Sequence, residues 1–196
     1  MKIILIRHGQ TNYNSKRLIQ GHVDAPLNNT GKKQAKSAAD TLIALEIKID
    51  KVISSPLSRA LETAHIVAKK LGIKDNIVID YNFIERDFGH YELTKIADNF
   101  PRIVQEEFIE DGYEDNESLY QRVLSGINTL NETYHDKTVI IAAHAHVIRA
   151  FYILMDRQTY NFTNFFLGNG SIHIFEFKNN KFNLLETHNN EEWLDF

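Results

Sequence analysis

The stretch Lys2-Ile3-Ile4-Leu5-Ile6 decides how this chain is read, because its apolar run stops abruptly at Arg7-His8-Gly9. The run is too short for a typical helix and is rich in β-branched residues, so it predicts a buried strand. Open α/β sheets bind their ligands outside the carboxyl ends of their strands. Two potential positive charges there favour an anionic ligand near Arg7 and His8, although an exposed loop accounts for the tripeptide alone equally well.

The composition is that of an ordinary globular chain of 196 residues, long enough for one domain with a full core. The net charge of −4 gives no reason to expect a nucleic acid or an anionic membrane as a partner. The sequence holds no cysteine, which excludes disulfides, thiolate metal sites and a cysteine nucleophile. Neither a signal peptide nor a transmembrane stretch is recognised, so a cytoplasmic location is expected.

Apolar runs alternate with helical patterns along the chain, which is typical of an α/β layer protein. A helix is predicted over residues 30–47, a short strand over 51–54 and another strand over 77–79. Between these two strands, Ser55-Pro56 supplies a cap and a proline at the first helical position, and Gly72 can end that helix.

Residues 86–117 differ in composition from the rest of the chain, with ten acidic residues against three basic ones. We expect this segment to be a lid-like insertion over the edge of the sheet, helical around residues 100–109. Most of its acids are expected to form a solvated surface.

Regular patterns resume at Ser118, which matches the capping-box spacing with Gln121 at the start of a long helix. Residues 138–143 then form a second fully apolar strand, which ends in His144. A further helical pattern extends from there through Met155.

The chain closes with a predicted hairpin of residues 172–177 and 182–186, turning at Asn179-Asn180 and placed at one edge of the sheet. Together these elements predict a single α/β domain over residues 1–196. Its expected architecture is three-layered, α/β/α, with a mostly parallel central sheet, an edge hairpin and a small lid insertion.

Three strand ends carry chemistry that fits together. Two buried strands end in His8 and His144, a third ends at Ser54-Ser55, and Arg59 lies in the helix that follows. If the strands are parallel neighbours, all three ends open on one crevice, where the helix N-terminus favours a phosphate. Arg7 and Arg59 each offer two parallel donors to phosphate oxygens, a geometry that lysine lacks.

Four motifs occur in order over nearly the whole chain. They are Arg7-His8-Gly9-Gln10-Thr11 followed by Gln20-Gly21 and Asp24-Ala25-Pro26-Leu27, Ser54-Ser55-Pro56-Leu57-Ser58-Arg59-Ala60, Glu85-Arg86-Asp87-Phe88-Gly89, and His144 with Ile148-Arg149. This series resembles the histidine phosphatase superfamily, which includes the phosphoglycerate mutases. One short motif recurs by chance, but four in order on compatible elements are specific.

The resemblance implies roles for single residues. His8 would be the nucleophile that accepts a phosphoryl group, and Glu85 would protonate the leaving oxygen and later take a proton from water. The phosphate would be bound by four further residues: Arg7, Asn14, Arg59 and His144. The residues expected near the rest of the substrate are Gln20, Gly21, Arg86 and Ala145. No metal and no cofactor is implied.

Two departures from the family pattern concern residues beside the site. Ala145 and His146 follow the fourth-motif histidine, where glycine is frequent, and His146 either contacts phosphate or faces elsewhere, the second being slightly favoured. Leu93 stands where many members have a glycine, so the backbone path of the lid does not follow from the family pattern.

The reaction predicted is metal-independent hydrolysis of a small phosphomonoester through a phosphohistidine. A cofactor-dependent phosphoglycerate mutase is the alternative, since both reactions begin with the same intermediate. The acidic segment 86–117 should repel a polyanionic cofactor and so favours hydrolysis, whereas Arg86 beside Glu85 could grip a second anionic group. A non-catalytic phospho-ligand or protein-binding module is less expected, because His8 and Glu85 are both present. The physiological substrate and the oligomeric state are left open.

Overall fold

The computed structural model describes residues 1–73 and 77–189. In chain order its elements are β1 (Lys2–Arg7), α1 (Asn12–Ser15), α2 (Asn29–Ala44), β2 (Lys51–Ser54), α3 (Ser58–Lys70), β3 (Val78–Ile79), η1 (Tyr81–Phe83), η2 (Gly89–Tyr91), α4 (Ile96–Ile103), α5 (Asn116–Tyr134), β4 (Thr138–Ala143), α6 (Ala145–Met155), β5 (Ile172–Lys178) and β6 (Lys181–His188).

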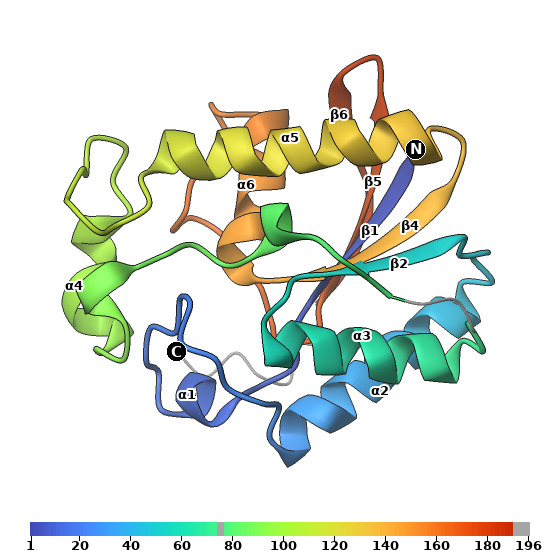
Figure 1. Ribbon diagram of the computed structural model, residues 1–196, viewed down its shortest axis with the longest axis horizontal. Helices are drawn as coiled ribbons and strands as arrows, with labels where there is room; N and C mark the ends of the chain where they lie inside the picture. The colour runs from blue at the N-terminus through green and yellow to red at the C-terminus, as the bar shows by residue number, and fades with distance from the viewer. Residues whose placement is uncertain (74–76, 190–196) are drawn as a thin grey trace.

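The described strands form one sheet in the order β3-β2-β4-β1-β5-β6 (Figure 1). Strands β1, β2, β3 and β4 run parallel to one another. Strand β5 pairs antiparallel with β1 and with β6, which ends the sheet at one edge. The predicted hairpin is therefore confirmed. Asn179 and Asn180 both adopt positive φ angles, 52° and 57°, which a two-residue turn of this kind requires and asparagine tolerates.

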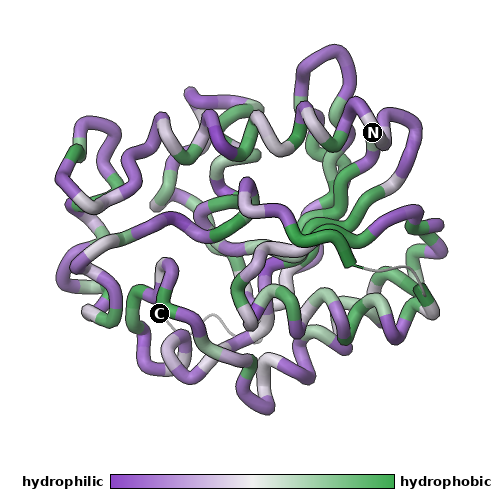
Figure 2. Tube along the Cα trace, in the orientation of Figure 1, coloured by the Kyte–Doolittle hydropathy of each residue, from purple (hydrophilic) through white to green (hydrophobic). Residues whose placement is uncertain are grey.

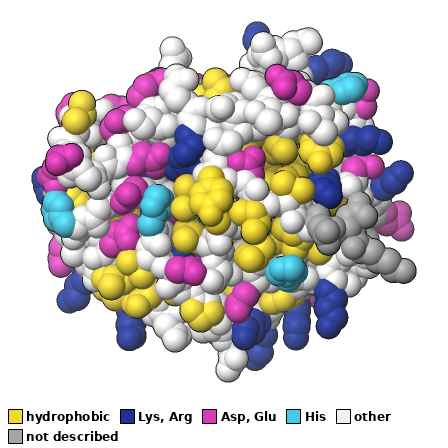
Figure 3. Space-filling model, in the orientation of Figure 1, with side chains coloured by type: hydrophobic (Ala, Val, Ile, Leu, Met, Phe, Trp, Pro, Cys, Tyr) yellow, Lys and Arg dark blue, Asp and Glu magenta, His cyan; other side chains and the backbone are white. Residues whose placement is uncertain are grey.

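Helices cover both faces of the sheet, which confirms the predicted three layers. Alternate residues of β1 point to opposite faces, so Ile3 and Leu5 pack in one cluster with α5 and α6. Ile4 and Ile6 pack in a second cluster with α2 and α3. Figure 2 shows the hydrophobic strands at the centre, and Figure 3 shows hydrophobic side chains across the middle of one face, over β3 and η1.

Several predicted boundaries are wrong, for local reasons. Helix α5 begins at Asn116 because Asp115, not Ser118, is the N-cap, and its carboxylate accepts from the Ser118 amide at 2.8 Å. Helix α3 begins at Ser58 rather than Pro56, after Leu57 in an extended conformation. The helix expected at residues 100–109 lies at Ile96–Ile103. The strand expected over 77–79 is limited to Val78–Ile79, and the helix expected over 30–47 ends at Ala44.

Among the described residues, none of the helices combines the length and the apolarity that crossing a membrane requires.

Candidate active site

The carboxyl ends of β1 and β4 bring two histidines together. The strands pair in parallel with Arg7 opposite Ala143, so His8 and His144 leave the sheet side by side. Their ring centroids lie 5.1 Å apart. Strand β2 pairs with the other side of β4, which places Ser55 at the same edge. The predicted convergence of three strand ends is therefore confirmed.

A cavity of about 620 Å³ opens at this edge of the sheet. Eight of the residues expected in the site line it: Arg7, His8, Asn14, Gln20, Gly21, Arg59, Glu85 and Ala145. His144 is fully buried next to the His8 ring. Arg86 is absent from the cavity lining.

The imidazole of His8 is held in one tautomer by its own loop. Its Nδ1 lies 2.7 Å from the carbonyl oxygen of Gly9, and because a carbonyl oxygen only accepts, Nδ1 carries the proton. Nε2 then keeps its lone pair. Gly9 packs so closely on Gly31 that a Cβ at Gly9 would lie 2.2 Å from the Gly31 carbonyl oxygen, so only glycine fits this loop.

Burial and neighbouring cations keep His8 neutral. The pKa of His8 lies well below 6.5, first because burial disfavours the imidazolium and then because Arg59 and Arg7 repel it. Burial also lowers the pKa of Arg7 to about 10, with Glu85 opposing that effect, so Arg7 remains charged at neutral pH. The floor of the cavity thus combines an uncharged imidazole with two guanidinium groups.

Backbone carbonyl groups orient both guanidiniums. Arg59 donates from Nη1 to the Val23 carbonyl oxygen at 2.9 Å and from Nη2 to that of Gly21 at 2.7 Å, and Arg7 donates to the Leu167 carbonyl oxygen. Among the described residues, the Nε atoms of both arginines have no hydrogen-bond partner, although they are buried. Unpaired buried donors suit an anion, because each pays a desolvation cost until it is bonded.

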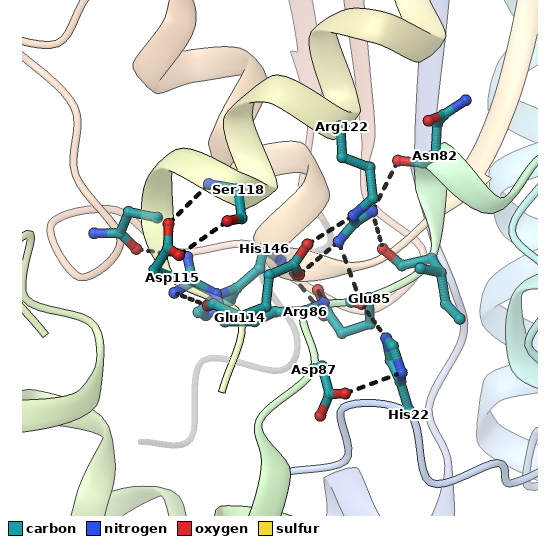
Figure 4. A network of polar contacts seen from close by, with 12 residues as sticks. His22, Asn82, Glu85, Arg86, Asp87, Glu114, Asp115, Ser118, Arg122 and His146 are labelled. Atoms are coloured by element: carbon teal, nitrogen blue, oxygen red, sulfur yellow. Dashed lines mark hydrogen bonds and ion pairs between the residues drawn. The ribbon is translucent and has the colours of Figure 1, made fainter. Parts of the chain in front are cut away.

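The carboxylate of Glu85 is fixed by two backbone amides. Oε1 accepts from the Arg86 amide at 2.9 Å, and Oε2 lies 3.4 Å from the His146 amide. Arg122 of α5 holds the segment that precedes Glu85, because it donates to the carbonyl oxygens of Asn82 and Ile84, both at 2.8 Å (Figure 4). Glu85 is 7% exposed, so it reaches the cavity while remaining largely shielded from solvent.

The expectation that Arg86 grips substrate does not fit its position. Its guanidinium is fully buried and donates to Tyr113 Oη at 2.7 Å and to Asn116 Oδ1 at 2.7 Å. The guanidinium carbon also lies 4.5 Å from the ring centroid of Phe162. Arg86 therefore joins the segment after Glu85 to the start of α5, as Figure 4 shows.

The role expected for Ser55 is also wrong. It does not cap α3 from the position before a helical proline. Its Oγ lies 2.7 Å from His144 Nε2 and accepts from the Leu57 amide at 3.3 Å. The α3 N-terminus is partly occupied as well, since the Ser58 amide donates to Asp24 Oδ1 at 2.8 Å.

His146 lies at the start of α6 and lines the cavity, and its ring packs among aromatic side chains. It is the second residue of α6 and is 2% exposed. Its ring stacks on Phe162 at 4.8 Å and meets the edges of Phe88 and Phe100. Burial, followed by repulsion from Arg86, places its pKa well below 6.5.

None of the acids of residues 86–117 lines the cavity. The described lining holds six Lys or Arg side chains and one acid, Glu85. Glu92 instead accepts from the His22 amide at 2.6 Å and the Val23 amide at 2.9 Å. Leu93 adopts a φ of 63°, so this leucine takes the left-handed conformation that glycine favours. The cavity lining is therefore more basic than the composition of residues 86–117 suggests.

Within the residues that the structure describes, no three His, Asp or Glu side chains gather in a way that could hold a metal ion. The positive field at the site comes from this chain's own arginines.

Comparison with known proteins agrees with this geometry. The model of the histidine phosphatase superfamily (branch 1) matches residues 3–190. The chain is 34% identical over 161 residues to phosphoglycerate mutase-like protein 4 of Arabidopsis thaliana, covering 77% of this chain and 69% of that protein. It is 30% identical over 194 residues to phosphoserine phosphatase 1 of Hydrogenobacter thermophilus, covering 91% of this chain and 89% of that protein.

A solved structure shares the whole architecture. Phosphoserine phosphatase of Entamoeba histolytica, crystallised as a mutant with phosphoserine, superposes with a TM-score of 0.80 at 25% identity, covering 95% of each chain. The sequence match, the shared fold and the two histidines at adjacent strand ends lead to one assignment. This chain belongs to the histidine phosphatase superfamily.

Proposed function

We propose that this protein is a phosphomonoesterase that acts through a phosphohistidine on His8 and needs no metal. The observation that carries the proposal is the state of His8: neutral, with Nδ1 bonded to Gly9 and Nε2 unprotonated, beside Arg7 and Arg59. An imidazole nucleophile must be neutral, and a phosphate dianion needs fixed positive charge around it.

The first half of the reaction forms the phosphoenzyme. Arg7, Arg59, His144 and Asn14 bind the phosphate oxygens and oppose the charge that develops on them. His8 Nε2 attacks phosphorus while the bond from phosphorus to the ester oxygen breaks, and protonated Glu85 gives its proton to that leaving oxygen. The products of this step are the free alcohol, phosphohistidine and a Glu85 carboxylate.

The second half returns the enzyme to its starting state. The Glu85 carboxylate takes a proton from a water molecule as that water attacks phosphorus, and the bond between phosphorus and Nε2 breaks. Inorganic phosphate leaves, His8 regains its lone pair, and Glu85 is again protonated.

Hydrolysis is favoured over isomerisation by the position of Arg86. A mutase must bind a small bisphosphate through both half-reactions. Arg86, the cation expected to bind the second anionic group, donates to Tyr113 and Asn116 instead. The relatives and neighbours with phosphatase names support the same choice. A phosphoglycerate mutase remains the second candidate, because the other bases of the cavity could hold a polyanion.

The test is a panel of phosphomonoesters assayed for phosphate release with and without excess chelator. We expect turnover that chelator leaves unchanged, and an acid-labile, base-stable phosphate on His8 after rapid quenching. Activity lost in chelator and restored by Mg²⁺ or Mn²⁺ would contradict metal independence. Rapid isomerisation of 3-phosphoglycerate with a trace of 2,3-bisphosphoglycerate, without phosphate release, would establish the mutase instead. No turnover of any ester would favour a phospho-ligand-binding module.

A further inference from the structure

The cavity changes in character from its floor to its mouth. The floor is formed by buried polar and ionisable groups, among them His8, Arg59 and Glu85. The walls above it are apolar and are contributed by residues 18–19, 96–97 and 166–167 together with two phenylalanines, Phe88 and Phe100. At the mouth, three exposed basic side chains line the cavity: Lys16, Arg17 and Lys95.

The basic mouth is built from two chain segments that are joined by their backbones. Ile96 donates its amide to the Arg17 carbonyl at 3.0 Å, and Ile19 donates to that of Thr94 at 2.9 Å. Leu18 and Lys95 form an antiparallel bridge between these segments. Directly opposite residues of an antiparallel pair place their side chains on the same face. The Lys95 side chain therefore lies beside that of Leu18, one of the apolar residues of the wall.

Two of the basic side chains at the mouth, Lys16 and Lys95, are available to a ligand. Throughout the described ranges, neither Lys16 nor Lys95 has an ion pair or a side-chain hydrogen bond. None of the acids of the neighbouring segment 86–117 lines the cavity. A ligand that enters therefore meets apolar walls and two lysines available for an anionic group.

The size of the cavity also argues for more than a three-carbon ester. Its volume of about 620 Å³ lies within the range of about 300–1,000 Å³ that holds drug-sized ligands. A small hydrophilic acid bound at the floor would leave Ile96, which is 37% exposed, and the half-buried Phe100 in contact with water. Burying these two side chains against an apolar ligand body would remove that cost.

We propose that the preferred substrates carry an apolar, ring-containing body on the phosphate ester and a second anionic group at the opposite end, which Lys16 and Lys95 bind. This inference rests on the proposed phosphatase activity and names its substrate class. The phosphate would lie at the floor, the apolar body between the walls, and the second anion at the mouth.

The experiment compares two matched esters. One is a phenyl phosphate with a para propanoate side chain, and the other carries propanamide in place of propanoate. Both release phenols of similar acidity, so a difference in kcat/KM reports recognition of the carboxylate. We expect wild type to prefer the propanoate by about tenfold at low ionic strength, mainly through KM, because exposed ion pairs each contribute a few-fold. The preference should fall toward one in about 1 M salt, where the Debye length is only about 3 Å.

The Lys16→Gln, Lys95→Gln double variant should lose the preference for propanoate at low salt. Lys69→Gln, Lys181→Gln is the matched control, since it removes two exposed lysines that do not line the cavity, and it should keep the wild-type ratio. Equal kcat/KM for the two esters in wild type, or an unchanged ratio in the Lys16, Lys95 variant, would overturn this inference while leaving the phosphatase intact. Failure of wild type to hydrolyse either ester would count against the phosphatase itself.

Discussion

His144 Nε2 and Ser55 Oγ lie 2.7 Å apart, which ties the histidine at the end of β4 to the residue that follows β2. Both side chains are fully buried. Among the described residues, Nδ1 of His144 has no partner. The hydroxyl of Ser55 therefore fixes the orientation of the imidazole beside the His8 ring.

Replacing Ser55 by alanine should lower kcat/KM by about tenfold, since one hydrogen bond that positions His144 is lost. Ser55→Thr, which keeps a hydroxyl, should recover part of the loss. Ser37→Ala, at an exposed position of α2, is the control. Activities are measured on one ester, with circular dichroism to check folding. An alanine variant as active as wild type would show that Ser55 does not position the histidine.

His8→Ala should reduce turnover by about ten-thousandfold or more, because this variant lacks the imidazole that is proposed to accept the phosphoryl group. The variant should still fold and should still bind phosphate, since both arginines remain. Phosphate release and calorimetric titration with inorganic phosphate measure these two properties. His65→Ala, exposed on α3, serves as the control. Retained covalent labelling of the His8 variant would move the nucleophile elsewhere.

Glu85→Gln should slow the release of alkoxide leaving groups by about a hundredfold or more, and that of p-nitrophenolate far less. A good leaving group departs without a proton, whereas an alkoxide needs one. The comparison uses kcat/KM, which reports formation of the phosphoenzyme and not its hydrolysis. Equal losses on both esters would mean that Glu85 does not act as the general acid.

Glu92 binds the loop whose carbonyls orient Arg59, because it accepts from the amides of His22 and Val23. Glu92→Ala should therefore raise KM several-fold and weaken inhibition by inorganic phosphate. Glu107→Ala removes an exposed acid of the same segment and should change neither value. If the two variants behave alike, the contact at Glu92 does not support the phosphate site.

Acidification should destabilise the fold through its buried histidines. The pKa of His173 is lowered to about 3, and those of His8 and His144 lie well below 6.5, in each case mainly because of burial. Above about pH 6.5 these groups are neutral in both states. Below that pH the unfolded chain binds protons that the folded chain does not, so the free energy of unfolding falls.

Each such histidine contributes at most about 1.4 kcal/mol per pH unit. Urea denaturation between about pH 7.5 and pH 5.5 measures the slope. His173→Gln should make it shallower, whereas His65→Gln should not. A stability that is constant over this range would show that the buried histidines bind protons in the folded state.

The sequence by itself determined the strand at the amino terminus, the histidines after β1 and β4, and the hairpin at the sheet edge. These features follow from local patterns: unbroken apolar runs predict buried strands, and Asn-Asn with its left-handed tolerance predicts a tight turn. The four ordered motifs then predicted which side chains meet at the cavity, and eight of those named do line it.

Only the tertiary structure decided where Arg86, Ser55, His146 and the acidic segment point. Each depends on partners far along the chain: Arg86 on Asn116, Ser55 on His144, and Glu92 on the amides of His22 and Val23. A buried polar group must find a hydrogen-bond partner, and which partner lies within reach is fixed by packing rather than by neighbouring residues. The charge counted along residues 86–117 therefore did not predict the cavity lining, in which Glu85 is the one acid among the described residues.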